Sequence, residues 1–303
     1  MRWLKKPYRW ACLFSLMLVA SSSWILLKAF VLPDRQVAVA TVAESTMSTS
    51  NSTEESTSSS ETIVATDTSY TSDGLTIQLI EKRVDDTTVY IADIQTADSS
   101  HLQTAFAENT YGRNIKETTS EMAAQNNAVL AINGDYYGFR STGFVMRNGT
   151  LYRDTANGDT QALVIDKEGN FSIVDESTTS AASLTDAQQI LSFGPALVEE
   201  SQVVVSPSTE VSQSMTSNPR TAIGQIGENH YVIIVSEGRT SDSEGLTLYQ
   251  LAEQFESLGA TTAYNLDGGG SSTLYFNGKV VNQTVGGSNN SDERSVSDIL
   301  YFK

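Results

Sequence analysis

The residues best suited to binding and cleaving a polar ligand follow a short apolar run near the C-terminal end of the chain. Residues 262–266 have the composition of a buried strand, and Asp267 comes directly after them. Three glycines follow, which cost more chain entropy than a simple turn would require. A carboxylate beside bare N–H groups and hydroxyls suits an anionic, hydroxyl-bearing ligand, although a glycine loop capped by an aspartate would have the same sequence. The candidate binding residues of this loop are Asn265, Gly268, Gly269, Gly270, Ser271 and Ser272.

Polar clusters also follow two other apolar runs, at residues 128–132 and 231–235. Strand ends at one edge of a sheet commonly assemble a site, so we expect the clusters to converge. Turns also use Asn, Asp and Gly, and each cluster alone could therefore be a turn. The clusters are Asn133 with Asp135, Glu237 with Arg239, and Asn265 with Asp267, and Arg220 in an Asn-Pro-Arg segment adds a further cation.

Familiar catalytic motifs of other kinds do not occur in the sequence. The two histidines, His101 and His230, have no accompanying triad motif, and there is no HExxH, Walker or GxGxxG sequence. A metal ion held by Asp135, Glu237 or Asp267 would have only oxygen ligands, which suits calcium or magnesium. The spacing of these carboxylates requires no cofactor, so such an ion is an option that the sequence leaves open.

Hairpins supply most of the elements that would position these residues. Apolar runs separated by turn residues predict four hairpins, and apolar residues on one side predict two helices. The helix between the runs at 231–235 and 262–266 permits one crossover, so we expect an α+β domain with a mixed, largely antiparallel sheet and packed helices. The predicted hairpins are 75–83 with 87–96, 143–147 with 151–153, 162–166 with 171–174 and 217–223 with 231–235; the helices are 114–126 and 247–258; residues 176–190 are irregular or partly helical; and the last strand is 296–302.

The N-terminus has the pattern of a membrane segment. Four basic residues within the first nine precede an apolar run at residues 10–32, which is long enough to cross a bilayer. The positive flank predicts that the N-terminus stays inside and that the rest of the chain lies outside the cell membrane as a single-pass protein. Secretion after signal cleavage near Ala40 is the alternative. We favour the uncleaved anchor because the apolar run is longer than a usual signal core.

A polar segment separates the anchor from the rest of the chain. Residues 41–72 contain 19 Ser or Thr among 32 residues. Such a segment buries too little apolar surface to fold, so we expect a disordered stalk. The predicted division is a cytoplasmic flank and anchor at 1–35, a Ser/Thr-rich linker at 36–72 and a folded domain at 73–303.

Charge and cysteine content exclude several functions. Residues 1–35 carry six basic residues and one acidic residue, whereas the remainder carries 13 basic and 35 acidic residues, a net charge of −22. A domain this acidic is a poor partner for nucleic acid. The single cysteine, Cys12, lies in the apolar run, so the domain has no disulfide and no thiol nucleophile. No sequence feature specifies an oligomeric state.

Five segments in a fixed order resemble the phosphodiester glycosidase family from about residue 73 to the C-terminus. That family includes a lysosomal enzyme that removes N-acetylglucosamine from a phosphodiester on mannose, and bacterial surface proteins linked to exopolysaccharide. One departure is Glu237, where the family's pattern leads us to expect aspartate. The segments are Asn-Gly-Asp-Tyr-Tyr at 133–137, Phe-Gly-Pro-Ala-Leu at 193–197, Asn-Pro-Arg-Thr-Ala-Ile-Gly at 218–224, Glu-Gly-Arg with Gly-Leu-Thr-Leu at 237–248, and Asn-Leu-Asp-Gly-Gly-Gly-Ser-Ser-Thr at 265–273.

The resemblance implies hydrolysis of a sugar C1–O bond in a sugar-1-phosphodiester of a glycan or wall polymer. Its transition state needs a carboxylate near the anomeric carbon, and arginine is the residue that binds phosphate bidentately. The candidate carboxylates are Asp267, then Glu237, then Asp135; the phosphate candidates are Arg220, Arg239 and Arg294, with the N–H groups of Gly268, Gly269 and Gly270; and the candidates for binding sugar hydroxyls are Asn133 and Asn265.

Two other functions are compatible with the same residues. One is a non-catalytic module that binds anionic glycans during exopolysaccharide biosynthesis. The other is a metal-dependent phosphodiesterase that cuts the P–O bond, and chelator sensitivity would distinguish it from a glycosidase. Turnover would distinguish the glycosidase from the binding module.

Overall fold

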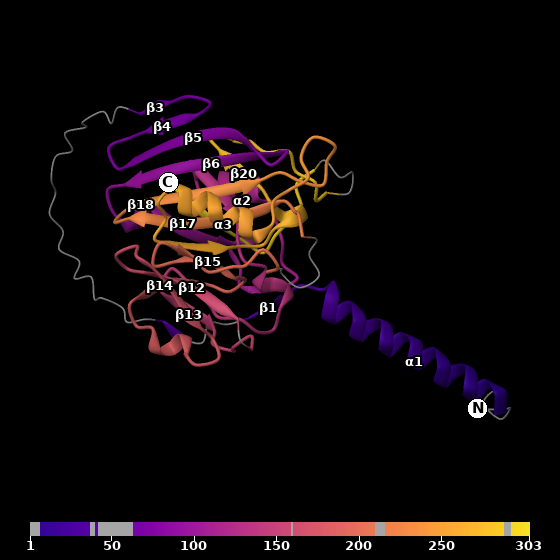
Figure 1. Ribbon diagram of the computed structural model, residues 1–303. Coiled ribbons are helices and arrows are strands. Elements are labelled where there is room, and N and C mark those ends of the chain that lie inside the picture. Colours follow the sequence, from indigo (N-terminus) through magenta and orange to yellow (C-terminus); the bar gives the residue numbers. More distant parts are fainter. Residues whose placement is uncertain (1–6, 37–39, 42–62, 159, 210–215, 288–291) are drawn as a thin grey trace, which may run out of the picture.

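The computed structural model describes residues 7–36, 40–41, 63–158, 160–209, 216–287 and 292–303. Figure 1 shows a folded body of β-sheets, with one long helix that projects away from it. The helices are α1 (Pro7–Phe30), α2 (Thr119–Gln125) and α3 (Leu248–Ser257).

The largest sheet has nine strands and contains two of the predicted hairpins. Within the β5–β6 hairpin, Leu75, Ile77 and Leu79 are buried and alternate with exposed residues, as expected for a strand with one face on the core. In spatial order the strands are β16 (Gln202–Val203), β15 (Ala196–Glu199), β19 (Thr262–Asn265), β17 (Arg220–Gly227), β18 (His230–Ser236), β6 (Thr87–Thr96), β5 (Leu75–Val84), β4 (Ser69–Thr71) and β3 (Val64–Ala65).

Three smaller sheets complete the described structure. The six-stranded sheet contains β13 (Phe171–Asp175), β12 (Gln161–Asp166), β14 (Ala187–Leu191), β10 (Val145–Arg147), β11 (Thr150–Arg153) and β2 (Ala40–Thr41). The five-stranded sheet contains β21 (Lys279–Val280), β20 (Leu274–Phe276), β9 (Leu130–Asn133), β22 (Asp298–Phe302) and β7 (Leu102–Phe106). β1 (Asp34–Arg35) pairs only with β8 (Gly112–Arg113) among the described strands.

One apolar core joins the three large sheets. Ile77 of the nine-stranded sheet, Ile132 of the five-stranded sheet and Leu163 of the six-stranded sheet belong to the same buried cluster. A second cluster lies under α3, whose apolar stripe packs on β15, β16 and β19. Thr247 caps this helix in a capping box with Gln250. The predicted helix at 247–258 is therefore confirmed.

The α+β class and the largely antiparallel sheets are confirmed, but the expected mixed pairing is not found among the described strands. Every described strand pair is antiparallel. The crossover through α3 does connect β18 to β19. Because β17 lies between those two strands, they run in the same direction without pairing.

Two predicted elements differ from the structure. The segment at 176–190, expected to be irregular or partly helical, leads into strand β14 after a short 3-10 turn. Its polar Gln189 is buried and bonds across to Thr104, which explains why the strand has no apolar pattern. Helix α2 begins only at Thr119, because Thr118 caps it and Glu117 bridges to Val296 in extended conformation.

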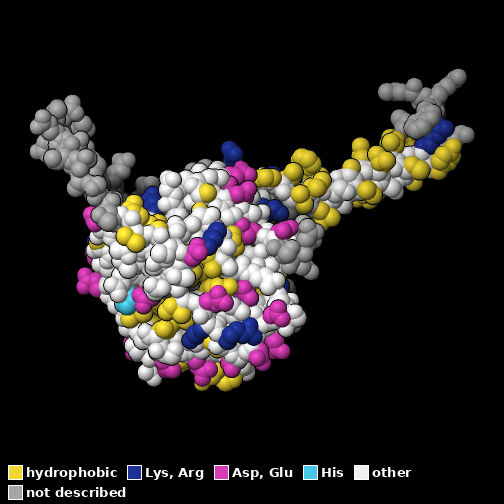
Figure 2. Space-filling view, turned by 90° about the horizontal axis from the view of Figure 1, so that it is seen from above, with side chains coloured by type: hydrophobic (Ala, Val, Ile, Leu, Met, Phe, Trp, Pro, Cys, Tyr) yellow, Lys and Arg dark blue, Asp and Glu magenta, His cyan; other side chains and the backbone are white. Residues whose placement is uncertain are grey.

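The N-terminal helix stands clear of the folded body. Residues Tyr8–Lys28 of α1 are long and apolar enough to cross a membrane, which suits an anchor or a signal sequence equally. Figure 2 shows hydrophobic side chains along its whole length. The expected stalk falls largely on residues 42–62, outside the described residues. Within the range assigned to the linker, β3 pairs with β4 and β4 pairs with β5, so the described nine-stranded sheet includes Val64 and the boundary at Asp73 stays a prediction.

Candidate active site

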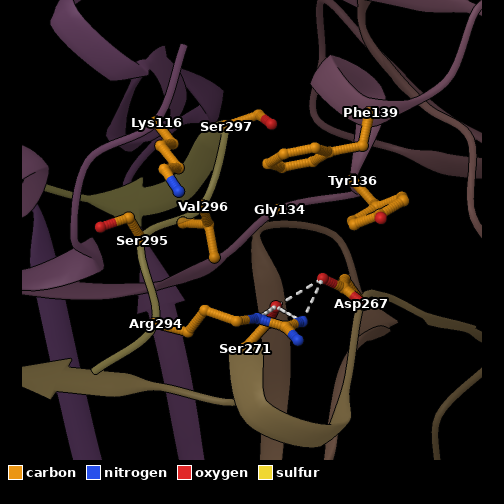
Figure 3. A pocket seen from close by; sticks show the side chains of 10 residues that line it. All are labelled: Lys116, Gly134, Tyr136, Phe139, Asp267, Ser271, Arg294, Ser295, Val296 and Ser297. Atoms are coloured by element: carbon orange, nitrogen blue, oxygen red, sulfur yellow. Dashed lines mark hydrogen bonds and ion pairs between the residues drawn. The ribbon is translucent and has the colours of Figure 1, made fainter. Parts of the chain in front are cut away.

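A small cavity of about 200 Å³ lies where segments from two sheets and the approach to α2 meet. β9 ends beside the start of β22, since Asn133 pairs with Ile299, and the loop after β19 contacts the residue that follows β9. Two of the three predicted clusters therefore do converge. The lining residues are Gly134, Tyr136 and Phe139 after β9, Asp267 and Ser271 after β19, residues 294–297 before β22, and Lys116 before α2 (Figure 3).

Asp267, Ser271 and Arg294 form the polar floor of this pocket (Figure 3). Ser271 Oγ donates to Asp267 Oδ2 at 2.5 Å, and Arg294 Nη2 lies 3.3 Å from the same carboxylate oxygen. Arg294 Nε also donates to Ser271 Oγ at 3.0 Å. Burial raises the pKa of Asp267, whereas the Ser271 hydrogen bond and the positive charges of Arg294 and Arg140 oppose that rise. The result is an oriented carboxylate with increased basicity.

Asn133 positions Asp267 through the backbone. Its side-chain amide donates to the carbonyl of Asp267 at 2.6 Å, and its Oδ1 accepts from Thr221 Oγ1 at 2.9 Å and from the backbone N–H of Thr273. Asn133 is fully buried. It was expected to bind sugar hydroxyls, but these contacts fix three protein segments and leave its side chain no access to the pocket.

Asn265 and Ser272 are likewise buried outside the pocket. Asn265 Nδ2 donates to the carbonyl of Gly194 at 2.8 Å, which ties the end of β19 to the turn before β15. Of the predicted polar residues in this loop, only Asp267 and Ser271 line the cavity. β19 ends at Asn265, so Asp267 lies beyond the strand and its side chain does not follow the alternation of β19.

The glycine loop is explained by close protein contacts. A Cβ on Gly268 would lie 2.8 Å from the carbonyl oxygen of Pro219, and a Cβ on Gly270 would lie 2.8 Å from the Cα of Gly286. Gly269 has φ +60 and donates its N–H to Pro219. The N–H groups of Ser271 and Ser272 close the 3-10 turn by donating to the carbonyls of Gly268 and Gly269. The glycines therefore allow close packing of this loop, and of the three N–H groups that the sequence suggested for phosphate, that of Gly269 is bonded to a carbonyl of the protein itself.

The third predicted cluster lies outside the pocket. Glu237 is buried and accepts from the backbone N–H of Gln283 at 2.7 Å and from Tyr90 at 3.4 Å. Arg220 is also buried, and its Nε donates to the carbonyl of Leu246 at 2.9 Å. Arg239 donates to Asn218 Oδ1 at 2.9 Å, with its guanidinium against the glycine loop. These three side chains hold the neighbouring loops together.

Asp135 belongs to a buried charge network behind the pocket wall. Arg147 Nη2 lies 3.0 Å from Asp135 and 2.7 Å from Asp298. Asp135 also accepts from the backbone N–H of Ser192 at 2.8 Å. A Cβ on the pocket-lining Gly134 would lie 2.3 Å from Asp298, so the network supports the wall directly. Asp135 is thus placed to position this wall and does not face the cavity.

The network makes stability depend on pH. Burial and the neighbouring Asp135 raise the pKa of Asp298 to about 7, against the opposing effect of Arg147. Between about pH 4 and pH 7 the folded state holds a proton that the unfolded state has lost, so stability falls as pH rises through this window. An asparagine at position 298 has no such proton to lose. We therefore expect the free energy of unfolding of Asp298→Asn to fall by roughly 1–3 kcal/mol less than that of wild type between pH 4.5 and pH 7.5. Urea unfolding at pH 4.5 and pH 7.5 would measure it, and equal pH dependence in both proteins would contradict it.

Several pocket residues were not predicted from the sequence. Tyr136 has φ +69 and stacks on Phe139 with ring centroids 4.8 Å apart and an angle of 26°. The Arg140 guanidinium lies 5.5 Å from the centre of the Tyr136 ring. The only available signal was the aromatic pair in the Asn-Gly-Asp-Tyr-Tyr segment. Lys116 had no signal, because its place in the pocket depends on the bridge between Glu117 and Val296.

Within the described part of the chain, no group of three or more His, Cys, Asp or Glu side chains could hold a metal ion. A calcium or magnesium ion held by Asp135, Glu237 or Asp267 stays a prediction. The pocket itself has one carboxylate, from Asp267, among its described lining residues.

Comparisons of sequence point to one family. The model of the phosphodiester glycosidase family matches residues 126–303. The SPbeta prophage-derived uncharacterized protein YomE of Bacillus subtilis (strain 168) is 35% identical over 199 residues, which are 63% of this chain and 30% of that protein. The N-acetylglucosamine-1-phosphodiester alpha-N-acetylglucosaminidase of Mus musculus is 24% identical over 179 residues, 54% of this chain and 34% of that enzyme. The chain thus spans about a third of the length of these curated relatives.

Comparisons of structure show the fold. The catalytic domain of the zebrafish N-acetylglucosamine-1-phosphodiester alpha-N-acetylglucosaminidase, auto-inhibited by its pro-peptide, superposes with a TM-score of 0.60 at 20% identity. The match covers 75% of this chain and 82% of that one. A hypothetical protein from Synechocystis superposes with a TM-score of 0.51 at 14% identity, covering 76% and 62%.

Proposed function

Because this chain belongs to the phosphodiester glycosidase family, we propose that its pocket hydrolyses the bond between C1 of a sugar and the oxygen of a phosphodiester. The observation that carries the proposal is the composition of the pocket floor. One carboxylate, from Asp267, is held against one guanidinium, from Arg294, at 3.3 Å in a cavity of about 200 Å³. A pocket of this size suits a single sugar ring better than a polymer chain.

A phosphate leaving group accounts for the single carboxylate among the described residues that line the pocket. Most glycosidases use two carboxyl groups, one of which protonates the leaving oxygen. A phosphate monoester has a second pKa of about 6 and leaves without prior protonation. It needs positive charge nearby, which Arg294 provides. Asp267 would then act on C1, either as the nucleophile or as the base for water, and Ser271 would hold its carboxylate in place.

The stacked aromatic pair is the proposed sugar platform. Tyr136 is 37% exposed and forms the wall on the side of Asp267 (Figure 3). An aromatic face can pack against the apolar face of a sugar ring. We expect Tyr136→Ala to raise KM by about 5- to 10-fold, corresponding to about 1 kcal/mol, with a smaller effect on kcat. Steady-state kinetics would measure this, and Tyr136→Phe, which keeps the ring, is the matched control. An unchanged KM in Tyr136→Ala would exclude the platform.

The N-terminal helix supports a proposal for where the protein acts. We propose that α1 is a membrane anchor with the folded domain outside, and that the substrate is a sugar-1-phosphodiester of a wall polymer or exopolysaccharide. The apolar span at Tyr8–Lys28 and the basic residues before it support this orientation. Secretion after cleavage near Ala40 would bring the same domain to the same side.

Turnover tests the proposal against both alternatives. The full-length protein in detergent would be incubated with a panel of sugar-1-phosphodiesters, with and without a chelator. We expect release of free reducing sugar that the chelator does not change. Binding without turnover would indicate an anionic-glycan module. Release of a sugar phosphate, abolished by the chelator, would indicate a metal-dependent phosphodiesterase.

A further inference from the structure

Lys116 reaches the pocket from the side away from Tyr136 and Asp267 (Figure 3). Its backbone is fixed on both sides. Ile115 is buried in the core, and Glu117 exchanges two backbone hydrogen bonds with Val296, at 3.0 and 2.8 Å. Ile115 is buried whereas Lys116 is exposed, so the two side chains point in opposite directions. Lys116 thus lies beside residues 294–297, the segment that also carries Arg294.

The pocket has one positive charge that its own carboxylate does not compensate. Its described lining residues include three charged side chains, those of Lys116, Arg294 and Asp267. Arg294 and Asp267 form an ion pair. No ion pair within 4.0 Å joins Lys116 to any carboxylate in the part of the chain that the structure describes. A local charge of +1 in a stretch of chain, residues 36–303, with a net charge of −22 selects an anion at this one place.

We propose that Lys116 binds the phosphoryl group of the substrate and stabilises the negative charge that it gains as it leaves. This inference rests on the proposed function. A phosphodiester carries one negative charge. When the C1–O bond breaks, its electron pair stays on the phosphoryl oxygen, and the product monoester approaches two negative charges at neutral pH. The oxygen of water joins C1 with one proton, and the other proton is released to Asp267 and then to solvent.

The charge change predicts where the effect should appear. Because the ammonium group meets more negative charge in the transition state than in the bound diester, its loss should reduce kcat more than it raises KM. We expect Lys116→Gln to lower kcat/KM by about 10- to 100-fold, below the effect of a fully buried donor because Lys116 is exposed. Lys116→Arg keeps the charge and should retain most of the activity.

Binding of phenyl phosphate, a monoester like the leaving group, tests the site without turnover. Isothermal titration of the full-length protein in detergent would compare wild type, Lys116→Gln and the control Lys167→Gln. Lys167 is a surface lysine paired with Asp186 at 2.7 Å, outside the pocket. We expect Kd to rise at least about 10-fold in Lys116→Gln and to stay unchanged in Lys167→Gln. Equal affinity in wild type and Lys116→Gln, equal loss in both variants, or no binding by wild type would overturn the inference.

The two proposals fail separately. If wild type releases sugar and Lys116→Gln matches it in both kcat and phenyl phosphate affinity, the Lys116 assignment is wrong and the glycosidase function stands. If wild type binds phenyl phosphate through Lys116 but releases no sugar, the phosphate site stands and the glycosidase function is wrong.

Discussion

Replacing Asp267 with asparagine is expected to lower kcat by at least about 10²-fold, the usual scale for a lost acid–base group. The amide keeps the size of the side chain and one acceptor oxygen for Ser271, but it loses the charge and the basicity. Stability should change little, because the backbone of Asp267 is held by Asn133 and Gly134 and does not depend on its carboxylate. Kinetics and thermal unfolding on one preparation would measure both effects.

The alternative role for Asp267 is a structural cap of the glycine loop. A cap predicts the opposite pair of results, with a lower melting temperature and nearly normal turnover. Ser271→Ala is the matched control, because it removes the hydrogen bond to the carboxylate and keeps the carboxylate itself. Its effect on kcat should therefore be smaller than that of Asp267→Asn. A variant of Asp267 that melts early yet turns over normally would remove this residue from the mechanism.

Replacing Arg147 with methionine is expected to cost about 3–5 kcal/mol of unfolding free energy. The substitution leaves Asp135 and Asp298 buried without the guanidinium that lies between them. Loss of a partner from a buried ion pair is costly because the remaining charge has neither water nor a counter-ion. Urea unfolding at pH 7.5 would measure the change.

Two controls separate a stranded charge from lost packing. Arg83→Met removes an exposed arginine and should change stability by less than about 1 kcal/mol. Adding Asp298→Asn to Arg147→Met removes one stranded carboxylate, so the double variant should be more stable than Arg147→Met alone. If Arg147→Met unfolds within about 1 kcal/mol of wild type, the network does not support the pocket wall in the way inferred.

Much of the fold could be predicted because its signals are local. The β5–β6 hairpin turns at Asp85 and Asp86, both with positive φ, and the polar residues there mark it in the sequence. The stripe and capping box of α3 are equally local. The order of strands within the sheets is not. No local pattern shows that β17 separates β18 from β19, and this separation prevents the parallel pair.

The site was predicted only in part, because contacts between distant segments have no local signal in the sequence. Asp267, Ser271 and Arg294 do come together, from segments that the sequence singled out. Glu237 and Asp135 also follow strand ends, but both are buried by contacts from distant segments. A strand end shows where a polar residue emerges, and the segment that covers it decides between a pocket and a buried network. That covering segment is a tertiary feature.

The most direct test of the proposed reaction is the position of the bond that breaks. Hydrolysis of a sugar-1-phosphodiester in ¹⁸O-labelled water would place the label in one of two products. Attack of water on C1 puts ¹⁸O in the released sugar and leaves the phosphate monoester unlabelled, which is the result we predict. Label in the phosphate would mean that the P–O bond breaks, and it would contradict a glycosidase centred on Asp267.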